Sequence, residues 1–354
     1  YPLLRASRTR YSQKLMMPLD SADLIKARDL LRSGDVVAIP TETVYGLAAS
    51  IDSEKGLRKI FSLKERPFFD PLIVHVSSFK QAQSVSREWP PLADFIARWF
   101  WPGPLTLVLP KAEHVNPVIT SGLDTVAIRY PAHPLANDLI ELVGTPLAAP
   151  SANKFGRTSP STAAHVRSEF PGEDLMILDG GASDVGVEST VISFAKTESG
   201  YEVRILRPGA VTKEALEEAI ARTSQAARVV MAESSESPGH LKHHYMPNAP
   251  LAIVNVKPDE KILATIAKDL GLAKPSKARE LELPEEAEQA ARLLYSEMRR
   301  LVNEGTDLIW VVESAARTGG LWTAIWDRLT RAASWNLGSF EAPESAAKPH
   351  AKRD

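Results

Sequence analysis

The chain of 354 residues contains no cysteine, which excludes disulfide bonds, thiolate catalysis, iron–sulfur clusters and cysteine-ligated zinc. No apolar run approaches the roughly 20 residues that a membrane-spanning helix requires. The formal net charge is −2, which argues against a general nucleic-acid coat protein but is compatible with a locally basic cleft. We therefore expect a cytoplasmic protein that does not associate with membranes and forms no stable nucleic-acid complex.

The common sequence signatures of phosphate, zinc and acyl-transfer sites are also absent. The chain has no G-x-x-x-x-G-K-[ST], no G-x-G-x-x-G, no H-E-x-x-H and no G-x-S-x-G. His240, His243 and His244 are close enough in sequence to suggest a metal, but no acidic partner lies near them. We therefore predict no protein ligands to a metal.

Strand and helix patterns alternate through most of the sequence, and several connections have the length of hairpins. They predict an α/β fold: a twisted, mixed, open sheet with helices, followed by a linker and a small Rossmann-like α/β domain. From 226 to 250 the apolar period is lost, which indicates an interdomain linker. The expected divisions are a basic N-terminal arm (1–19), a first α/β domain (20–225), the linker (226–250), the Rossmann-like domain (251–338) and a disordered tail (339–354). Whether the basic arm is a targeting segment stays open.

The segment from 64 to 76 carries two cations on a loop that proline breaks. Lys64 offers a compact point charge, and Arg66 offers a planar fork for phosphate or carboxylate oxygens. Pro67 and Pro71 exclude a helix and stiffen the loop, which lowers the entropy lost when it meets an anion. A solvated surface loop would have the same composition, so the segment alone does not define a site.

Further polar groups follow apolar strands in the same way, and such strand ends are where ligands bind in open α/β sheets. The cations and hydroxyl or amide groups at expected strand ends are Lys64, Arg66, His75, Arg129, Ser151, Asn153, Lys154, Arg157, Ser159, Ser189 and Arg207. Gathered in one concave place, they predict a cleft for a phosphorylated or carboxylated ligand.

Seven motifs in order over roughly residues 20–215 resemble one family. They are Pro40–Leu47 (PTETVYGL), Lys64–Pro67 (KERP), Pro71–His75 (PLIVH), Trp101–Thr106 (WPGPLT), Pro150–Asn153 (PSAN), Gly186–Val191 (GVESTV) and Leu206–Gly209 (LRPG). This part of the chain is similar to the YrdC-like threonylcarbamoyl-AMP synthases. The sequence His-Tyr-x-Pro in the linker and the small C-terminal α/β domain resemble the long, two-domain branch.

The resemblance implies a nucleotidyltransferase that condenses L-threonine, bicarbonate and ATP to threonylcarbamoyl-AMP and pyrophosphate. The adenylate then serves formation of threonylcarbamoyladenosine at position 37 of tRNAs that read ANN codons, through a downstream transferase machinery. Mg²⁺ is expected to accompany ATP and to shield the leaving pyrophosphate, with no tightly bound cofactor. The linker, with Tyr245 reaching the nucleotide, is expected to fold over the cleft as a lid.

The resemblance also implies roles for individual residues. The set associated with catalysis is Lys64, Arg66, Ser151 and Asn153. The residues expected to hold threonine are Thr43, His75, Arg129, Ala149 (through its backbone) and Ser189. The residues expected to hold ATP are Arg66, Asp70, Thr125, Ser151, Ser159, Arg207 and Tyr245.

Asp70 departs from the family pattern, which usually has asparagine before Pro71 and Leu72. An amide can donate a hydrogen bond to a phosphate, whereas an ionised carboxylate cannot. Three interpretations stay open: Asp70 helps to bind Mg²⁺, points away from the nucleotide, or weakens nucleotide binding.

Three other functions are compatible with parts of the sequence. A module that binds double-stranded RNA in a basic cleft would lose affinity steeply with salt and need no threonine. A carbamoyl-adenylate-forming domain of hydrogenase maturation proteins would bring cysteines and an acylphosphatase unit, and nothing here matches them. A hydrolase would use Ser151, His75 and Asp179, without the nucleophile elbow that usually accompanies such a triad.

Overall fold

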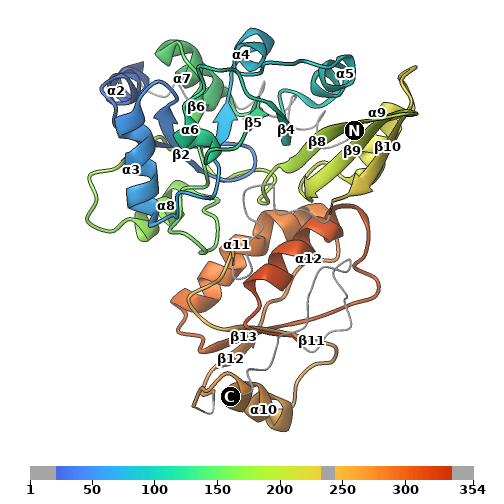
Figure 1. Ribbon diagram of the computed structural model, residues 1–354. Helices are drawn as coiled ribbons and strands as arrows, with labels where there is room; N and C mark the ends of the chain where they lie inside the picture. Colours follow the sequence, from blue (N-terminus) through green and yellow to red (C-terminus); the bar gives the residue numbers. More distant parts are fainter. Residues whose placement is uncertain (1–20, 233–243, 274, 337–354) are drawn as a thin grey trace, which may run out of the picture.

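The computed structural model describes residues 21–232, 244–273 and 275–336 (Figure 1). The expected basic arm, the expected tail after 338 and residues 233–243 of the expected linker lie outside these ranges. None of the described helices combines the length and the apolar character that crossing a membrane requires.

The first domain is built on a mixed sheet, as the alternating pattern predicted. Within the described residues its ten strands have the order β10-β9-β8-β4-β5-β3-β6-β2-β1-β7. The strands are β1 Val37–Ile39, β2 Gly46–Ser50, β3 Ile73–His75, β4 Leu105–Pro110, β5 Thr125–Arg129, β6 Leu147–Ala148, β7 Met176–Ile177, β8 Thr190–Thr197, β9 Gly200–Arg207 and β10 Ala227–Met231. β3 runs parallel to β5, whereas β4 is antiparallel to β5 and parallel to β8.

Helices cover this sheet. They are α2 Ser21–Arg32, α3 Glu54–Lys64, α4 Phe79–Ser84, α5 Pro91–Phe100, α6 Pro117–Thr120, α7 Pro134–Val143, α8 Ala163–Glu169 and α9 Lys213–Ile220. The side chain of Ser53 caps α3 by accepting a hydrogen bond from Gly56 N, which satisfies one of the helix's unpaired amide donors. α3 ends at Lys64, where Glu65 adopts a left-handed conformation with φ 53°. The helix therefore delivers the cationic loop directly to the ends of the strands.

Two boundaries differ from the expectation. Residues 227–231 form β10, which pairs in parallel with β9, so the first sheet continues into the segment expected to be linker. Gly46 already belongs to β2 and pairs with Ile39 of β1, so the hydroxyl-rich loop ends one residue before it. The short strand β10 is only partly buried, and an edge strand of this kind shows a weak apolar pattern in sequence.

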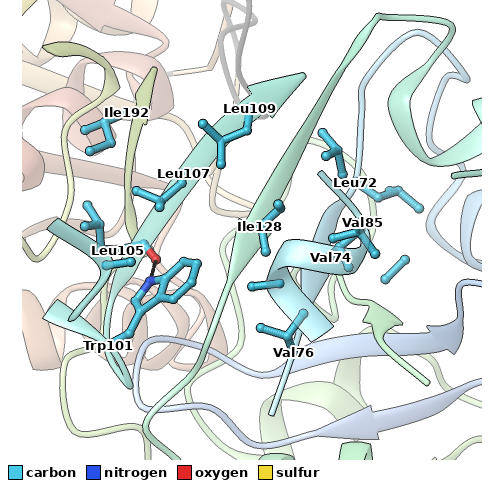
Figure 2. Close-up of a cluster of buried hydrophobic side chains, with 14 of the residues drawn as sticks. Leu72, Val74, Val76, Val85, Trp101, Leu105, Leu107, Leu109, Ile128 and Ile192 are labelled. Atoms are coloured by element: carbon cyan, nitrogen blue, oxygen red, sulfur yellow. Dashed lines mark hydrogen bonds between the residues drawn. The ribbon is translucent and has the colours of Figure 1, made fainter. Parts of the chain in front are cut away.

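Strand β4 shows how side-chain alternation separates the core from the site. Leu105, Leu107 and Leu109 enter the main apolar core with Ile128 and Val74 (Figure 2). Trp101 lies in the same cluster, where its indole Nε1 donates to Leu105 O at 2.7 Å (Figure 2). Because successive side chains of a strand point to opposite faces, Thr106 points away from this core. Its hydroxyl meets that of Ser189 at 2.8 Å.

The C-terminal domain holds a second, parallel sheet, in agreement with the expected Rossmann-like unit. Within the described residues its strand order is β12-β13-β11-β14. The elements are β11 Leu251–Val254, α10 Glu260–Asp269, β12 Ala278–Glu280, α11 Ala287–Asn303, β13 Leu308–Val312, α12 Gly320–Ala332 and β14 Trp335–Asn336. Helices α11 and α12 lie between this small sheet and the first domain (Figure 1). Their apolar cluster includes Val44 and Val187 of the first domain, so the two domains share a continuous core.

Candidate functional site

A cavity opens where strands and loops of the first domain meet residues 244 and 245. It is lined by Thr41, Thr43, Val44, Tyr45, Gly46, Arg66, Pro71, Ile73, His75, Arg129, Ala149, Pro150, Ser151, Glu188, Ser189, Arg207, His244 and Tyr245. His75 and Arg129 are paired residues at the carboxyl ends of the parallel strands β3 and β5. The site therefore lies at strand ends, where the sequence placed it.

Arg129 is fixed in the cavity wall by three partners. Its guanidinium forms an ion pair with Glu42 at 2.7 Å and donates to the Thr43 hydroxyl at 2.8 Å. Nε–H of Arg129 also donates to Gly103 O at 3.4 Å. The side chains of Arg129 and Glu42 are 5% and 1% exposed, so each charge needs the other. The Pro40–Tyr45 loop, which contains Glu42 and Thr43, thereby fixes the plane of the guanidinium.

His75 is neutral in this environment. Burial and then the neighbouring charge of Arg129 lower its pKa to about 3, although a hydrogen bond with Ile73 O opposes this. The distance from Nδ1 to that carbonyl is 3.2 Å. A neutral imidazole beside a buried guanidinium can donate or accept a hydrogen bond without adding to the positive charge.

Arg207 and Ser189 line the same cavity, at the end of β9 and directly before β8. Arg207 donates to Ser189 O at 2.9 Å and to the Ser189 hydroxyl at 3.3 Å. That hydroxyl also contacts Thr106. A guanidinium and a hydroxyl are thus held side by side and face the cavity.

Lys64 is buried and joins two loops. Its ammonium donates to Ser151 O at 2.5 Å and to Asn153 O at 2.6 Å. Burial and then the adjacent charge of Arg66 lower the pKa of Lys64 well below its usual range. The Asn153 amide in turn donates to Arg157 O at 2.9 Å. Lys64 and Asn153 therefore shape the loop that presents Ser151, and neither lines the cavity itself.

Arg66 lines the cavity and forms an ion pair with the carboxylate of Asp70. Its guanidinium lies 2.9 Å from the Asp70 carboxylate, with both side chains at most 6% exposed. It also donates to Asp70 O and Pro71 O, at 3.2 and 2.8 Å. Asp70 does not line the cavity. The residue that departs from the family pattern therefore compensates the charge of Arg66 from behind.

Ser159 and Glu188 connect the site to the C-terminal domain. The Ser159 hydroxyl donates to the Glu188 carboxylate at 2.6 Å. From the other domain, Tyr295 of α11 donates to the same carboxylate at 3.0 Å and Arg328 of α12 at 2.8 Å. Tyr245 is stacked on Tyr295, with ring centroids 5.9 Å apart. The position of Tyr245 in the cavity wall thus depends on the C-terminal domain.

Nine of the residues expected from the resemblance line one cavity: Thr43, Arg66, His75, Arg129, Ala149, Ser151, Ser189, Arg207 and Tyr245. Lys64, Asp70, Asn153 and Ser159 lie behind the wall and contact lining residues or their loops. Thr125 does not join them. It is the first residue of β5, paired with Pro110, and is four residues from Arg129, about 13 Å along the strand.

The sequence analysis missed four residues that complete the site. Glu188 and His244 line the cavity, but both were noted only as parts of motifs, and His244 also as a metal alternative. Tyr295 and Arg328 are absent from the predicted set because a contact across more than 100 residues leaves no local signal. For Glu188 a signal existed, since a carboxylate stands two residues before the strand β8.

Two alternatives lose support from the geometry. His75 Nδ1 is engaged with Ile73 O, whereas the carboxylate of Asp179 accepts from Gly181 N and from Tyr45. The hydrolase triad is therefore not assembled. Among the described residues, no cluster of three or more histidine or acidic groups can hold a metal. His240 and His243 lie outside those residues, and the ring of His244 packs against Phe155 and Tyr245.

Comparison with known proteins finds two family models that together match most of the chain. The family model described as Telomere recombination (Sua5, YciO and YrdC) matches residues 29–209. The model described as the threonylcarbamoyl-AMP synthase C-terminal domain matches residues 211–334. The boundary between the two matches therefore lies before the segment that was expected to be the linker.

Individual relatives agree. The threonylcarbamoyl-AMP synthase of Pyrococcus abyssi is 38% identical and covers 88% of this chain and 94% of its own. That of Bacillus subtilis is 39% identical over 88% and 92% of the two chains. A crystal structure of Pyrococcus abyssi Sua5 complexed with L-threonine has a TM-score of 0.76 at 37% identity, covering 89% of this chain and 96% of that one. The chain thus belongs to the threonylcarbamoyl-AMP synthase family, with both the YrdC-like and the C-terminal domain.

Proposed function

We propose that this protein condenses L-threonine, bicarbonate and ATP into threonylcarbamoyl-AMP with release of pyrophosphate. One observation carries the proposal: Arg66, Arg129 and Arg207 are all buried, and all face one cavity. Glu42 and Asp70 balance two of these charges from outside the cavity lining, so the three guanidinium groups present N–H donors and positive charge to a phosphate or carboxylate within it. Membership of a family of adenylate-forming enzymes identifies the class of those anions.

The threonine would occupy the wall formed by β3, β5 and the loop after β1. Arg129 offers its guanidinium to the carboxylate of the amino acid, and Thr43 and Ser189 offer hydroxyls. Neutral His75 accepts or donates one hydrogen bond without repelling an amine. Ala149, just after β6, brings backbone groups to the same wall. The crystal structure of the Pyrococcus abyssi relative was solved with L-threonine, which supports an amino-acid site in this fold.

ATP would occupy the remaining wall, toward the C-terminal domain. Arg66 and Arg207 supply cations for phosphate oxygens, and Ser151 supplies a hydroxyl. Ser159 stands behind this wall with its hydroxyl on Glu188, and Tyr245 closes the space from the other side. Lys64 and Asn153 act on the loop rather than on the ligand. Thr125 is left out of the proposed site because it lies at the far end of β5.

The chemistry needs alignment and charge neutralisation more than a protein nucleophile. The carbamate formed on threonine's amine has a carboxylate oxygen that attacks the α-phosphorus, and the bond to pyrophosphate breaks. Both reactants are anions, so three buried guanidinium groups lower the electrostatic cost of their approach. Mg²⁺ would arrive on the ATP phosphates as part of the substrate. The carboxylates near the cavity are already engaged: Glu42 with Arg129, Asp70 with Arg66, and Glu188 with Arg328.

The adenylate would then be consumed by a transferase that modifies adenosine 37 in tRNAs reading ANN codons. A mixed carboxylic–phosphoric anhydride hydrolyses readily, so exclusion of water from the cavity would protect it. The packed rings of His244 and Tyr245 at the cavity wall support such exclusion.

Pyrophosphate release tests the proposal directly. The full chain is incubated with ATP, Mg²⁺ and bicarbonate, with and without L-threonine, and the product is identified by mass spectrometry. Release that requires both threonine and bicarbonate, with threonylcarbamoyl-AMP as product, is the expected result. Release that does not depend on threonine would contradict the proposal, as would tight, salt-sensitive RNA binding without any adenylate.

A further inference from the structure

Glu188 is the carboxylate through which the two domains meet at the cavity. It lines the cavity and is 6% exposed. One carboxylate oxygen accepts from Ser159, and Tyr295 reaches both oxygens. The second oxygen accepts from Nε–H of Arg328. Each oxygen of the carboxylate therefore has donors, and those that come from the C-terminal domain are Tyr295 and Arg328.

Arg328 is the cation that balances this carboxylate. Its side chain is fully buried, with 0% exposure, although it belongs to a helix of the other domain. It also donates to Pro208 O at 2.7 Å, next to Arg207, and lies over the ring of Tyr245 at 5.1 Å. The same guanidinium also pairs with Asp327 on its own helix at 2.7 Å, so two carboxylates share it.

The charge of Glu188 is also coupled to the first domain. Burial raises its pKa, but the charges of Arg328 and then Arg207 outweigh this, and the pKa is about 2. Glu188 therefore stays ionised at neutral pH and sits between two guanidinium groups. A buried negative charge in the wall of an anion site would repel the ligand unless a fixed cation compensated it.

We propose that Arg328 is a positioning residue whose charge neutralises Glu188, so that the C-terminal domain sets how strongly the cavity attracts an anion. This inference rests on the proposed function only in taking a nucleotide as that anion. It gives the C-terminal domain an electrostatic role at the site in addition to packing. The role differs from a structural one because it depends on charge and not on the shape of the side chain.

The test uses ATP with Mg²⁺ as the probe and calorimetric titration of the full chain. Arg328→Gln removes the cation and is expected to weaken ATP binding about tenfold or more. Glu188→Gln removes the repelling charge while keeping an acceptor for Ser159, and is expected to bind ATP a few-fold more tightly. The double variant is expected to return to within about threefold of wild type, because neither charge remains.

Two controls separate charge from packing. Arg300→Gln makes the same substitution on α11, but Arg300 pairs with Glu297 and Glu304 at the surface and not with Glu188, and ATP affinity is expected to be unchanged. Arg328→Lys keeps the charge and is expected to retain most of the affinity. Thermal unfolding of every variant is measured, and titrations are made well below each midpoint.

The outcomes distinguish this inference from the proposed function. A double variant that binds as weakly as Arg328→Gln alone would overturn the inference, because a purely structural role predicts that result. Wild-type affinity in Arg328→Gln would overturn it too. If Arg328→Gln does not fold, weaker ATP binding by Glu188→Gln overturns the inference and tighter binding supports it. Absence of ATP binding by the wild type would instead overturn the proposed function, and this inference with it.

Discussion

The two sheets of this protein treat buried polarity in opposite ways. The large mixed sheet ends in buried charges, among them Arg66, Arg129 and Arg207. In the described residues from 251 to 336, the buried polar side chains are Thr306 and Arg328, and Arg328 points to the first domain. The small parallel sheet therefore packs almost entirely through apolar side chains, whereas the large sheet bears the charged residues that line the cavity.

The difference shows which domain bears the free-energy cost of burying the charged side chains of the site. A buried cation is tolerated only with a partner, and the large domain supplies one for Arg129 in Glu42 and one for Arg66 in Asp70. The small domain is stabilised by its apolar core, and its buried cation Arg328 pairs with Glu188 of the large domain. In the large domain the same residues therefore support both stability and ligand binding. In the small domain the apolar core supports stability without contacting the ligand. Four experiments can test that contrast.

The largest effect is expected from Arg129→Met. It leaves Glu42 buried without its partner, which should lower the free energy of unfolding by about 3–5 kcal/mol. It also removes the proposed contact to the threonine carboxylate, so kcat/KM for threonine should fall about a hundredfold or more. Denaturant unfolding and pyrophosphate release measure the two effects.

Adding Glu42→Gln to Arg129→Met separates the effect on stability from the effect on threonine turnover. Stability should largely recover because no unpaired charge remains, while the threonine-dependent rate should not. Arg98→Met is the matched control, since Arg98 pairs with Asp94 on the exposed face of α5. Recovery of threonine turnover in the double variant would show that Arg129 serves the fold alone.

The second largest effect is expected from Leu308→Ala in the small parallel sheet. Leu308 is fully buried on the face of the small sheet that packs against Ile266 and Trp310. The cavity left behind should cost about 2–5 kcal/mol of unfolding free energy. The KM values for ATP and threonine should stay unchanged, measured well below the midpoint. A rise in either KM would mean that packing in the small domain reaches the site, and the contrast would fail.

The same contrast explains what the sequence could predict. Strand-end cations such as Arg129 and Arg207 could be placed because an apolar strand followed by a charge is a local pattern, and the fold class follows from the same periodicity. The ion pairs of Glu42 with Arg129, Asp70 with Arg66 and Glu188 with Arg328 could not be assigned, because ion pairing depends on which segments meet in space. Thr125 shows the converse: its role is taken from a family resemblance, and it lies about 13 Å along β5 from Arg129, outside the lining of this cavity.

A smaller effect concerns pH. His75 has a pKa of about 3 in the folded protein against 6.5 ordinarily, so below pH 6.5 the unfolded chain binds a proton that the folded one does not. Stability is therefore lost as pH falls from 6.5 toward 3. Between pH 7 and 5 His75 should account for about 2 kcal/mol of that loss, and His75→Gln should remove it. An unchanged pH dependence of stability in His75→Gln would refute the assignment.

The smallest expected effect, from Asp70→Asn, bears most directly on charge in the large domain. Asp70 compensates Arg66 without lining the cavity, so it reduces the attraction of that guanidinium for a phosphate. Asparagine keeps an acceptor for Arg66 and removes the opposing charge, which should lower the KM for ATP about threefold to tenfold. Glu65→Gln removes a carboxylate from the same loop, but Glu65 pairs with Lys154 at the surface, where solvent screens it, and the KM should not change. If Asp70→Asn instead raised the KM for ATP, the carboxylate would be needed to orient the Arg66 guanidinium, and its effect on the attraction for phosphate would be secondary. Asp70 would then serve the structure of its loop and not the strength of ATP binding.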